Sequence, residues 1–405
     1  MKSISFTNDV TSLCFHPTEL NILAACEING AVSCYRVEEE SSEQLFTAKY
    51  HKDSCRVVEF SDDGKELYSG GKDKSFQILD TSTGKPILKK AAAHDDPINA
   101  LSPLDPHIVV TGDEGGVVKI WDTRERKLAM KYSVNEDFIS DFAYVSEKST
   151  LLATSADGRL SVFDIRKKKP IRVSDNQEDE LLSVVLVKDT KKAVVGSEDG
   201  ILSIFSWDNW GDLTDRLPGH PGSIDSIAKL DESRILTGCS DGKIRLVSIF
   251  PNKVLTSLRD HDLDLMIERI RLNADGTVLA SCSHENMVRF WDTSDLGAGD
   301  DDEDEEEDDE DDNDDSDEDA EESNAEDNED GDEPEEDDQH EDDQDEAESD
   351  DEDRSEKEVP RKGKRVSKDS DDDSESEKRK PKKSEPQVKK HRPNATQNAY
   401  FGDLD

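Results

Sequence analysis

Short runs of alternating apolar and polar residues, separated by Asp, Gly and Asn, follow one another along residues 1–296. The stretch from residue 55 to residue 91 shows the pattern, with CRVVEFS, DDG, KELYSGG, KDKS, FQILD and then PILKKA. Alternation with a period of two is typical of β-strands, and the intervening residues favour tight turns. No long run with helical periodicity competes with it. The chain is therefore predicted to consist of units of four short strands.

One turn-and-strand phrase, GGVVKIWD at residues 115–122, recurs along this region in altered copies. Copies aligned on its second glycine are 42 or 44 residues apart, and the aligned positions are Gly30, Lys74, Gly116, Gly158, Gly200, Gly242 and Asn286. Several of these positions follow an Asp, as hairpin turns that need a positive φ prefer. Seven four-stranded units at this spacing predict an all-β fold, a seven-bladed β-propeller.

The units resemble the WD-repeat family. The Trp-Asp pair that marks this family stands at Trp121-Asp122 and Trp291-Asp292, and altered forms are Leu79-Asp80 and Phe163-Asp164. The resemblance implies that residues 1–297 form one WD-repeat propeller. The seventh unit ends near Asp292 without a fourth strand, so we expect residues 3–6 to supply it. Closure of this kind would remove the open edges of the ring.

The same resemblance implies a buried network in each blade, made of a His, a Ser or Thr, an Asp and the Trp. The candidate members are His51, Ser69, Asp73, Trp121, His220, Thr237, Asp241 and Trp291. The network is expected to be incomplete in every blade, because Leu79 and Val247 replace Trp in two blades, and Gly115 and Glu285 replace Asp in two others. We interpret these residues as structural.

No motif for catalysis or cofactor binding is found. The chain contains no phosphate-binding loop, no GxSxG and no HExxH. We expect a protein that is not an enzyme and that has no catalytic residue, cofactor or metal site. A rigid ring with variable loops is better suited to holding partners.

A closer resemblance is to the WD repeat-containing protein 55 family. It rests on DKSFQILD, AHDDPINAL, GDEGGVVKIWDTR and FSWDNWG within the ring, and on AYFGDL at residues 399–404. The resemblance implies a protein of the nucleus and nucleolus that acts in ribosomal RNA synthesis and ribosome biogenesis. The acidic block described next is longer than expected of vertebrate members.

Charge divides the chain into three zones. Residues 300–353 contain 40 Asp or Glu among 54 residues and no Lys or Arg, and residues 354–405 carry a net charge of +4. Since the whole chain carries −49, residues 1–299 carry −13. Only this first zone has enough apolar residues to form a core. Residues 298–353 are therefore predicted to be a disordered acidic tract, and residues 354–405 a disordered basic tail with a short C-terminal motif.

Three features of the ring are candidates for binding. The first is a cationic turn that could meet RNA phosphates or the acidic tract, or could simply be solvated; its cations are Arg166, Lys167, Lys168 and Lys169. The second is the pair Trp207 and Trp210, which could anchor a partner or pack against their own blade. The third is Arg124 in WDTR, a sequence that resembles the box by which some WD-repeat proteins dock onto cullin-4 ligase adaptors. With a net charge of −13 and no extended basic run, the ring is predicted to have little electrostatic attraction for nucleic acid.

The tail suggests further partners. The acidic tract could attract basic proteins such as histones or ribosomal proteins, or could act only as a solubilising segment. Short basic clusters beyond it are interpreted as nuclear import signals. The clusters include Arg361, Lys362, Lys364, Arg365, Lys378, Arg379, Lys380, Lys382 and Lys383.

These observations favour a non-catalytic scaffold for pre-ribosomal protein factors in ribosomal RNA synthesis and processing, located in the nucleus and nucleolus. A substrate receptor of a cullin-4-type ubiquitin ligase is the alternative, and an acidic chaperone for histones or ribosomal proteins is the third hypothesis. Direct contact with RNA stays open. We expect a monomer that has no secretory signal and no membrane segment, in a compartment that keeps its six cysteines reduced.

Overall fold

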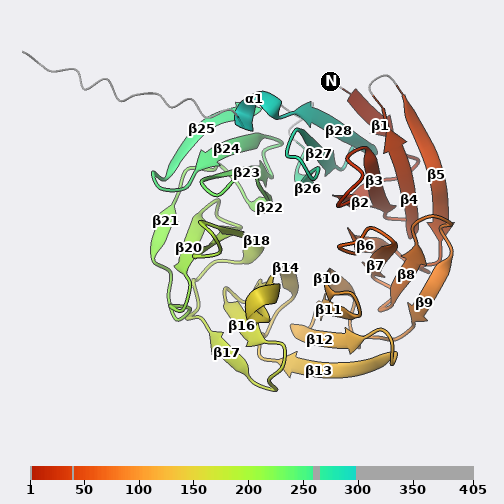
Figure 1. The fold of residues 1–405 in the computed structure, drawn as a ribbon. Coiled ribbons are helices and arrows are strands. Elements are labelled where there is room, and N and C mark those ends of the chain that lie inside the picture. Colours follow the sequence, from red (N-terminus) through yellow and green to blue (C-terminus); the bar gives the residue numbers. More distant parts are fainter. Residues whose placement is uncertain (1, 39–40, 259–264, 298–405) are drawn as a thin grey trace, which may run out of the picture. The chain divides into compact units, whose positions relative to one another are not determined.

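The protein is a ring of seven antiparallel four-stranded sheets (Figure 1). The structure, a computed structural model, describes residues 2–38, 41–258 and 265–297. The prediction of an all-β, seven-bladed propeller is confirmed. Within the described residues, no helix is long and apolar enough to cross a membrane. The acidic tract, the basic clusters and the C-terminal motif lie outside the described residues.

The strands follow the chain from the axis of the ring outward in each blade. In blades one to four the strands are β2 (Val10–Phe15), β3 (Ile22–Glu27), β4 (Ala31–Val37) and β5 (Ser42–Lys49); β6 (Cys55–Phe60), β7 (Glu66–Gly71), β8 (Phe76–Asp80) and β9 (Pro86–Lys90); β10 (Ile98–Asp105), β11 (Ile108–Asp113), β12 (Val117–Asp122) and β13 (Lys127–Ser133); β14 (Ile139–Val145), β15 (Thr150–Ser155), β16 (Leu160–Asp164) and β17 (Pro170–Val173). In blades five to seven they are β18 (Leu181–Val187), β19 (Lys192–Ser197), β20 (Leu202–Ser206) and β21 (Asp215–Leu217); β22 (Ile224–Lys229), β23 (Arg234–Cys239), β24 (Ile244–Ser248) and β25 (Lys253–Leu258); β26 (Ile267–Leu272), β27 (Val278–Ser283) and β28 (Met287–Asp292), with β1 (Lys2–Ser5) outermost.

The turn between the second and third strand of each blade explains the sequence repeat. All seven aligned positions have a positive φ, from +53° at Asn286 to +85° at Gly30. Glycine adopts this conformation without steric cost, whereas Lys74 and Asn286 adopt it with a side chain. Gly116 is constrained twice, since a Cβ atom there would lie 2.5 Å from the carbonyl oxygen of Asn135, in the connection to the next blade. The repeated glycine therefore allows both the turn and the close approach of neighbouring blades.

The N-terminal strand closes the ring, as the sequence predicted. β1 pairs antiparallel with β28, from Lys2 opposite Phe290 to Ser5 opposite Met287, so the strand begins one residue earlier than expected. Ile4 of this strand is buried, and the ring of the following Phe6 packs edge-on against Tyr35 of blade one at 5.3 Å. The N-terminus thus completes blade seven and contacts blade one.

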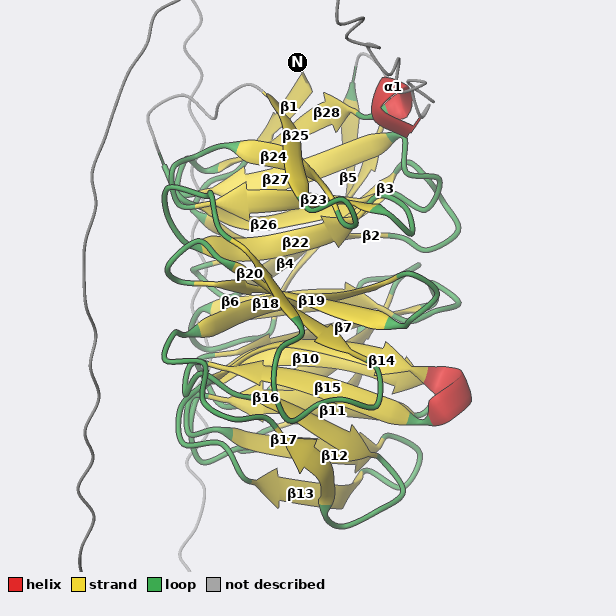
Figure 2. Cartoon of the chain, turned by 90° about the vertical axis from the view of Figure 1, so that its left-hand side faces the viewer, coloured by secondary structure: helices red, strands yellow, loops and turns green. Residues whose placement is uncertain are grey.

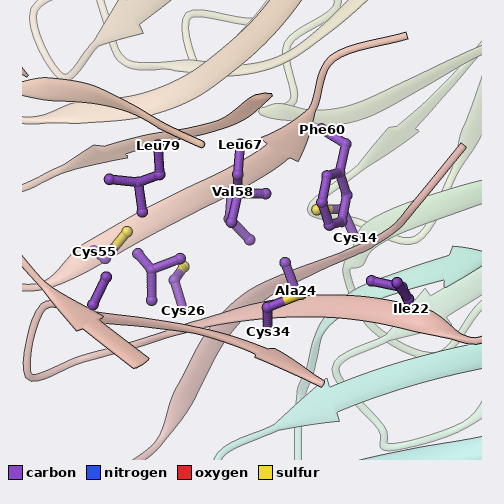
Figure 3. Close-up of a cluster of buried hydrophobic side chains, with 12 residues drawn as sticks. Cys14, Ile22, Ala24, Cys26, Cys34, Cys55, Val58, Phe60, Leu67 and Leu79 are labelled. Atoms are coloured by element: carbon purple, nitrogen blue, oxygen red, sulfur yellow. The ribbon is translucent and has the colours of Figure 1, made fainter. Parts of the chain in front are cut away.

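The hydrophobic core lies between blades, so that each sheet packs its two faces against its neighbours. Between blades one and two the core is rich in sulfur, and Figure 3 shows Cys14, Cys26, Cys34 and Cys55 among aliphatic side chains. All six cysteines are free and buried. Burial raises the pKa of the Cys34 thiol to about 12, so this thiol stays protonated and behaves as a small apolar group.

The turns define two faces of the ring. Because consecutive strands in a blade are antiparallel, turns from first to second and from third to fourth strand share one face, which we call the lower face. Turns from second to third strand and connections between blades form the upper face. The short helices η1 (Ser146–Lys148) and α1 (Ser294–Gly297) both lie on the lower face, to the right in Figure 2.

Candidate functional site

Blade three contains a complete hydrogen-bonded network. Trp121 Nε1 donates to Thr111 Oγ1 at 2.9 Å, and Thr111 Oγ1 lies 2.6 Å from His94 Nε2. His94 Nδ1 in turn lies 2.6 Å from a carboxylate oxygen of Asp113. Since a carboxylate can only accept, His94 donates from Nδ1 to Asp113, and Nε2 of the neutral imidazole accepts from the Thr111 hydroxyl. All four side chains are buried, which identifies the network as a structural pin.

The expectation that every blade lacks part of this network is wrong for blade three. The sequence alignment placed Gly115 where the carboxylate was required, but Asp113 at the end of β11 supplies it from two residues earlier. Burial lowers the pKa of His94, and the hydrogen bond to Asp113 opposes that shift only partly. The aspartate pKa is also below its ordinary value, because hydrogen bonds from His94 and the backbone outweigh the effect of burial. The pair is therefore a neutral imidazole beside a carboxylate.

Blades two and six contain incomplete versions of this hydrogen-bonded network. His51 bonds to Asp73 at 3.0 Å and to Ser69 at 2.9 Å, while Leu79 packs into the core where a Trp would stand. In blade six His220 bonds to Thr237 at 3.0 Å. Its Nδ1 atom has no hydrogen-bond partner among the residues that the structure describes.

The predicted members Asp241 and Trp291 have other or smaller roles. Asp241 binds Arg245 at 2.6 and 2.9 Å instead of His220. Trp291 Nε1 donates to Ser281 Oγ at 2.8 Å, and Glu285 in this blade binds Arg289. Both His220 and Trp291 are buried and face no solvent.

Ion pairs near the axis of the ring were not foreseen from the sequence. Arg271 of β26 binds Glu59 of β6 at 3.0 Å, and Arg269 of the same strand lies 3.9 Å from Asp141 of β14, in blade four. Burial lowers the pKa of Arg271, but Glu59 and Asp141 raise it and the net shift is upward. The axis is therefore occupied by paired charges that connect blade seven to blades two and four.

The upper face carries an acidic cavity between blades four and five. Its volume is about 570 Å³, and its lining contains Glu136, Asp137, Asp157, Glu178, Asp179, Glu180, Glu198 and Asp199 but no Lys or Arg. Burial, followed by the carboxylates of Glu198, Asp137 and Asp179, raises the pKa of Glu180. Nearby, burial raises the pKa of Asp225 to about 6, with further contributions from Glu268 and Glu198 and an opposing hydrogen bond from Ser223. Within the described ranges no His, Cys, Asp and Glu side chains are grouped so as to hold a metal ion.

The lower face of blade four carries the cationic turn. Arg166 and Lys167 bind the buried carboxylate of Asp164, Arg166 through Nε at 2.7 Å and Lys167 through Nζ at 3.1 Å. Lys168 and Lys169 are exposed and form no ion pair with any residue that the structure describes. The four predicted cations therefore divide into two that neutralise Asp164 and two that remain available to a ligand.

The two tryptophans differ in their surroundings. Their rings meet edge to face at 5.0 Å, but Trp210 is buried in the core between blades four and five, whereas Trp207 is only half-buried. The ammonium group of Lys148, in η1 of blade four, lies 3.6 Å from the centre of the Trp207 ring. Only Trp207 can contact a partner.

Arg124 is exposed on the lower face, in the turn after β12. Its Nε and Nη2 atoms bind both carboxylate oxygens of Asp122, at 3.3 and 2.9 Å. The bond from Arg124 lowers the pKa of Asp122 to about 2. The guanidinium is thereby held in one orientation while its other edge faces solvent.

Comparison with known proteins agrees with this architecture. The family model WDR55 matches residues 1–296, which is the ring. The chain belongs to the WD repeat-containing protein 55 family. WD repeat-containing protein 55 of Danio rerio is 46% identical over 289 residues, which cover 71% of this chain and 74% of that protein. The Arabidopsis thaliana protein of the same name is 36% identical over 287 residues, covering 70% of this chain and 80% of its own. WD repeat-containing protein JIP5 of Coprinopsis cinerea is 38% identical over 310 residues, 74% of each chain.

In this member of the WD repeat-containing protein 55 family, the family model covers the ring and ends before the acidic tract. The structural pins, Arg124, the cationic turn and Trp207 all lie within the residues that the family model covers. The acidic tract and the basic clusters begin after it. The ring is a protein-interaction scaffold of the WD-repeat type.

Proposed function

We propose that this protein is a non-catalytic scaffold for pre-ribosomal factors in ribosomal RNA synthesis and processing, located in the nucleus and nucleolus. The observation that carries the proposal is membership of the WD repeat-containing protein 55 family along the whole ring. The site geometry supports a binding role, because His51 and His94 are buried in structural hydrogen bonds while the polar groups free to meet partners lie on the two faces. An acidic cavity above and cations below offer separate contacts to partners of opposite charge.

Depletion of the endogenous protein tests this proposal. We expect pre-ribosomal RNA intermediates to accumulate, and expression of the full chain to restore their processing. Proteins recovered with the tagged full chain from nuclear extract should be pre-ribosomal factors. Unchanged processing after depletion, or recovery of free histones in place of pre-ribosomal factors, would contradict the proposal and favour the chaperone hypothesis.

One observation favours the second candidate, a substrate receptor of a cullin-4-type ligase. Arg124 is exposed and oriented by Asp122, as a docking residue needs to be. The test compares Arg124→Ala with Arg126→Ala, an exposed arginine of the same turn. If the protein is a substrate receptor, the ligase adaptor should be recovered with the wild type and with Arg126→Ala. It should not be recovered with Arg124→Ala. Absence of the adaptor from all three samples rejects this candidate.

A further inference from the structure

We propose that the lower face of blades four and five binds single-stranded RNA through its phosphates. The binding surface is the set Lys148, Lys168, Lys169, Lys191 and Trp207, which we call the basic arc. RNA binding at this surface would be an activity additional to the scaffold role, and it does not depend on the process in which the scaffold acts.

The basic arc is one continuous surface built from separate parts of the chain. The backbone N–H of Ile165, beside the cationic turn, donates to Ser149 O at 3.1 Å and joins that turn to the η1 segment. Lys148 of this segment lies over the ring of Trp207 of blade five, and the backbone N–H of Trp207 donates to the carbonyl oxygen of Lys191 at 2.9 Å. Cations from two turns of blade four therefore share a surface with a cation from blade five.

The turn that carries Lys168 and Lys169 is held in place. Tyr132 of blade three donates its hydroxyl to Lys167 O at 2.6 Å, and Arg166 and Lys167 bind Asp164 from within the turn. The exposed ammonium groups thus project from an ordered backbone, so binding would not have to order this segment of chain.

Among the described residues, only one of the four lysines of the basic arc forms an ion pair. Lys168 and Lys169 have no ion pair among the described residues, and the ammonium group of Lys148 lies over the aromatic ring of Trp207. Lys191 lies 3.7 Å from Asp189, and both side chains are largely exposed, so that pair is weak. Four lysines on one surface can therefore contact successive phosphates and release their counterions.

Trp207 distinguishes RNA from an acidic protein as the ligand. Surfaces that bind single-stranded nucleic acid combine cations that follow the backbone with aromatic rings that stack on bases. Trp207 supplies a half-buried ring at the centre of the basic arc, with the Lys148 ammonium over it, so a base can contact only the part of the ring that stays exposed. An acidic peptide needs only the cations. The eight carboxylates of the upper cavity repel phosphate, which restricts RNA to the lower face.

The test measures binding of a short single-stranded RNA to the purified full chain over a range of salt concentrations. Lys168→Glu/Lys169→Glu is compared with Lys52→Glu/Lys72→Glu, which makes the same charge change at exposed lysines of the upper face. We expect the first variant to weaken binding about tenfold or more at moderate salt and to reduce the salt slope by about one to two. The second should leave the slope unchanged, because the charges it alters lie away from the basic arc.

Equal effects of the two variants would overturn the proposal, since they would show that only net charge matters. Trp207→Leu, checked for an unchanged melting temperature, is expected to weaken RNA binding and to leave binding of polyglutamate unchanged. If polyglutamate competes for the basic arc and Trp207→Leu has no effect on RNA, the surface is a site for acidic proteins and the RNA assignment fails. Because purified components are used, neither result decides whether the protein acts in ribosome production.

Discussion

At the scale of single residues, the hydroxyl of Thr111 holds two larger side chains in place. It accepts from Trp121 and donates to His94, and all three residues are buried. A buried donor or acceptor that loses its partner costs about 1–3 kcal/mol. Ser69 has the equivalent place in blade two, where Leu79 replaces the Trp, and its hydroxyl bonds to His51 alone among the residues that the structure describes.

Thr111→Val is therefore expected to lower the free energy of unfolding by about 2–4 kcal/mol, because it leaves both an indole N–H and an imidazole nitrogen without partners. Ser69→Ala, the matched control, should cost about 1–2 kcal/mol, since one group is left unpaired. Urea denaturation of the two variants measures the difference. A Thr111→Val effect no larger than that of Ser69→Ala would show that the Trp121 hydrogen bond adds nothing.

A second residue-scale prediction concerns Asp225, whose pKa is raised to about 6 by burial. The folded state therefore binds the proton more tightly than the unfolded state, and stability falls as pH rises from about 4 to 6. Asp225→Asn removes this effect, so we expect the variant to be more stable than the wild type by about 1–3 kcal/mol at pH 7.5 and equal to it near pH 4.

Thermal or urea unfolding across this pH range provides the check. Asp199→Asn is the control, because it removes an exposed carboxylate of the adjacent cavity without the same burial. A constant difference between Asp225→Asn and the wild type at all pH values would contradict the assigned cause.

The sequence predicted some of these residue-scale features and could not predict others. The turn positions could be predicted because Gly116 and its equivalents all need a positive φ, which is a local property of the backbone. Asp113 was missed because the carboxylate can come from a strand end as well as from the turn, and only the fold shows which one reaches His94. The pair Arg269 and Asp141 has no local pattern at all, since the ring brings together strands that are remote in the sequence.

At the scale of elements, β1 decides whether the ring has an open edge. Its pairing with β28 was predictable because the count of strands in blade seven was one short, and closure needs a fourth. Its exact register was not, because an alternating run keeps the same side chains on the same face when it is shifted by two residues, so the pattern alone does not distinguish Ile4 from Phe6 as the buried position. The buried side chain of Ile4 fixes the register that the structure shows.

Deletion of residues 1–7 is expected to lower the free energy of unfolding by several kcal/mol and to expose the edge of β28, because it removes the strand's hydrogen bonds and the burial of Ile4. Ile4→Ala should reproduce part of this loss, about 2–4 kcal/mol, and Ser3→Ala, at an exposed position of the same strand, should be nearly neutral. The melting temperature is the measurement. A truncated protein that melts with the intact one would disprove closure by β1.

At the scale of the whole molecule, charges of opposite sign gather at two separate places on the ring, the upper cavity and the basic arc. The net charge of −13 on residues 1–299 gave no sign of this, because the cations of the basic arc come from turns at residues 148, 168–169 and 191. Folding places them together on the lower face while carboxylates collect around the upper cavity. Net charge is a sum, and it does not report how charges are distributed in space.

The division between ring and tail leads to a prediction about location. The basic clusters between Arg361 and Arg392 lie outside the described residues and are interpreted as import signals, so their removal should strongly reduce nuclear entry. A foreign import signal fused to the shortened chain should restore entry to the nucleus and, if the ring selects partners, to the nucleolus. Fluorescence microscopy of the tagged chains is the readout. A rescued chain that stays diffuse in the nucleus would assign nucleolar retention to the tail.

The pairing of β1 with β28 also determines when the ring can close during synthesis. Lys2 leaves the ribosome before the rest of the ring, yet its partner Phe290 is made 288 residues later. At about 5–20 residues per second, the first strand waits roughly 15–60 s with its backbone groups unpaired. Six blades can form their own sheets in that interval, but the seventh cannot be completed before the ring is fully translated. The last step of folding therefore uses the strand of the ring that was made earliest, and a nascent chain interrupted before β28 presents β1 as a free strand.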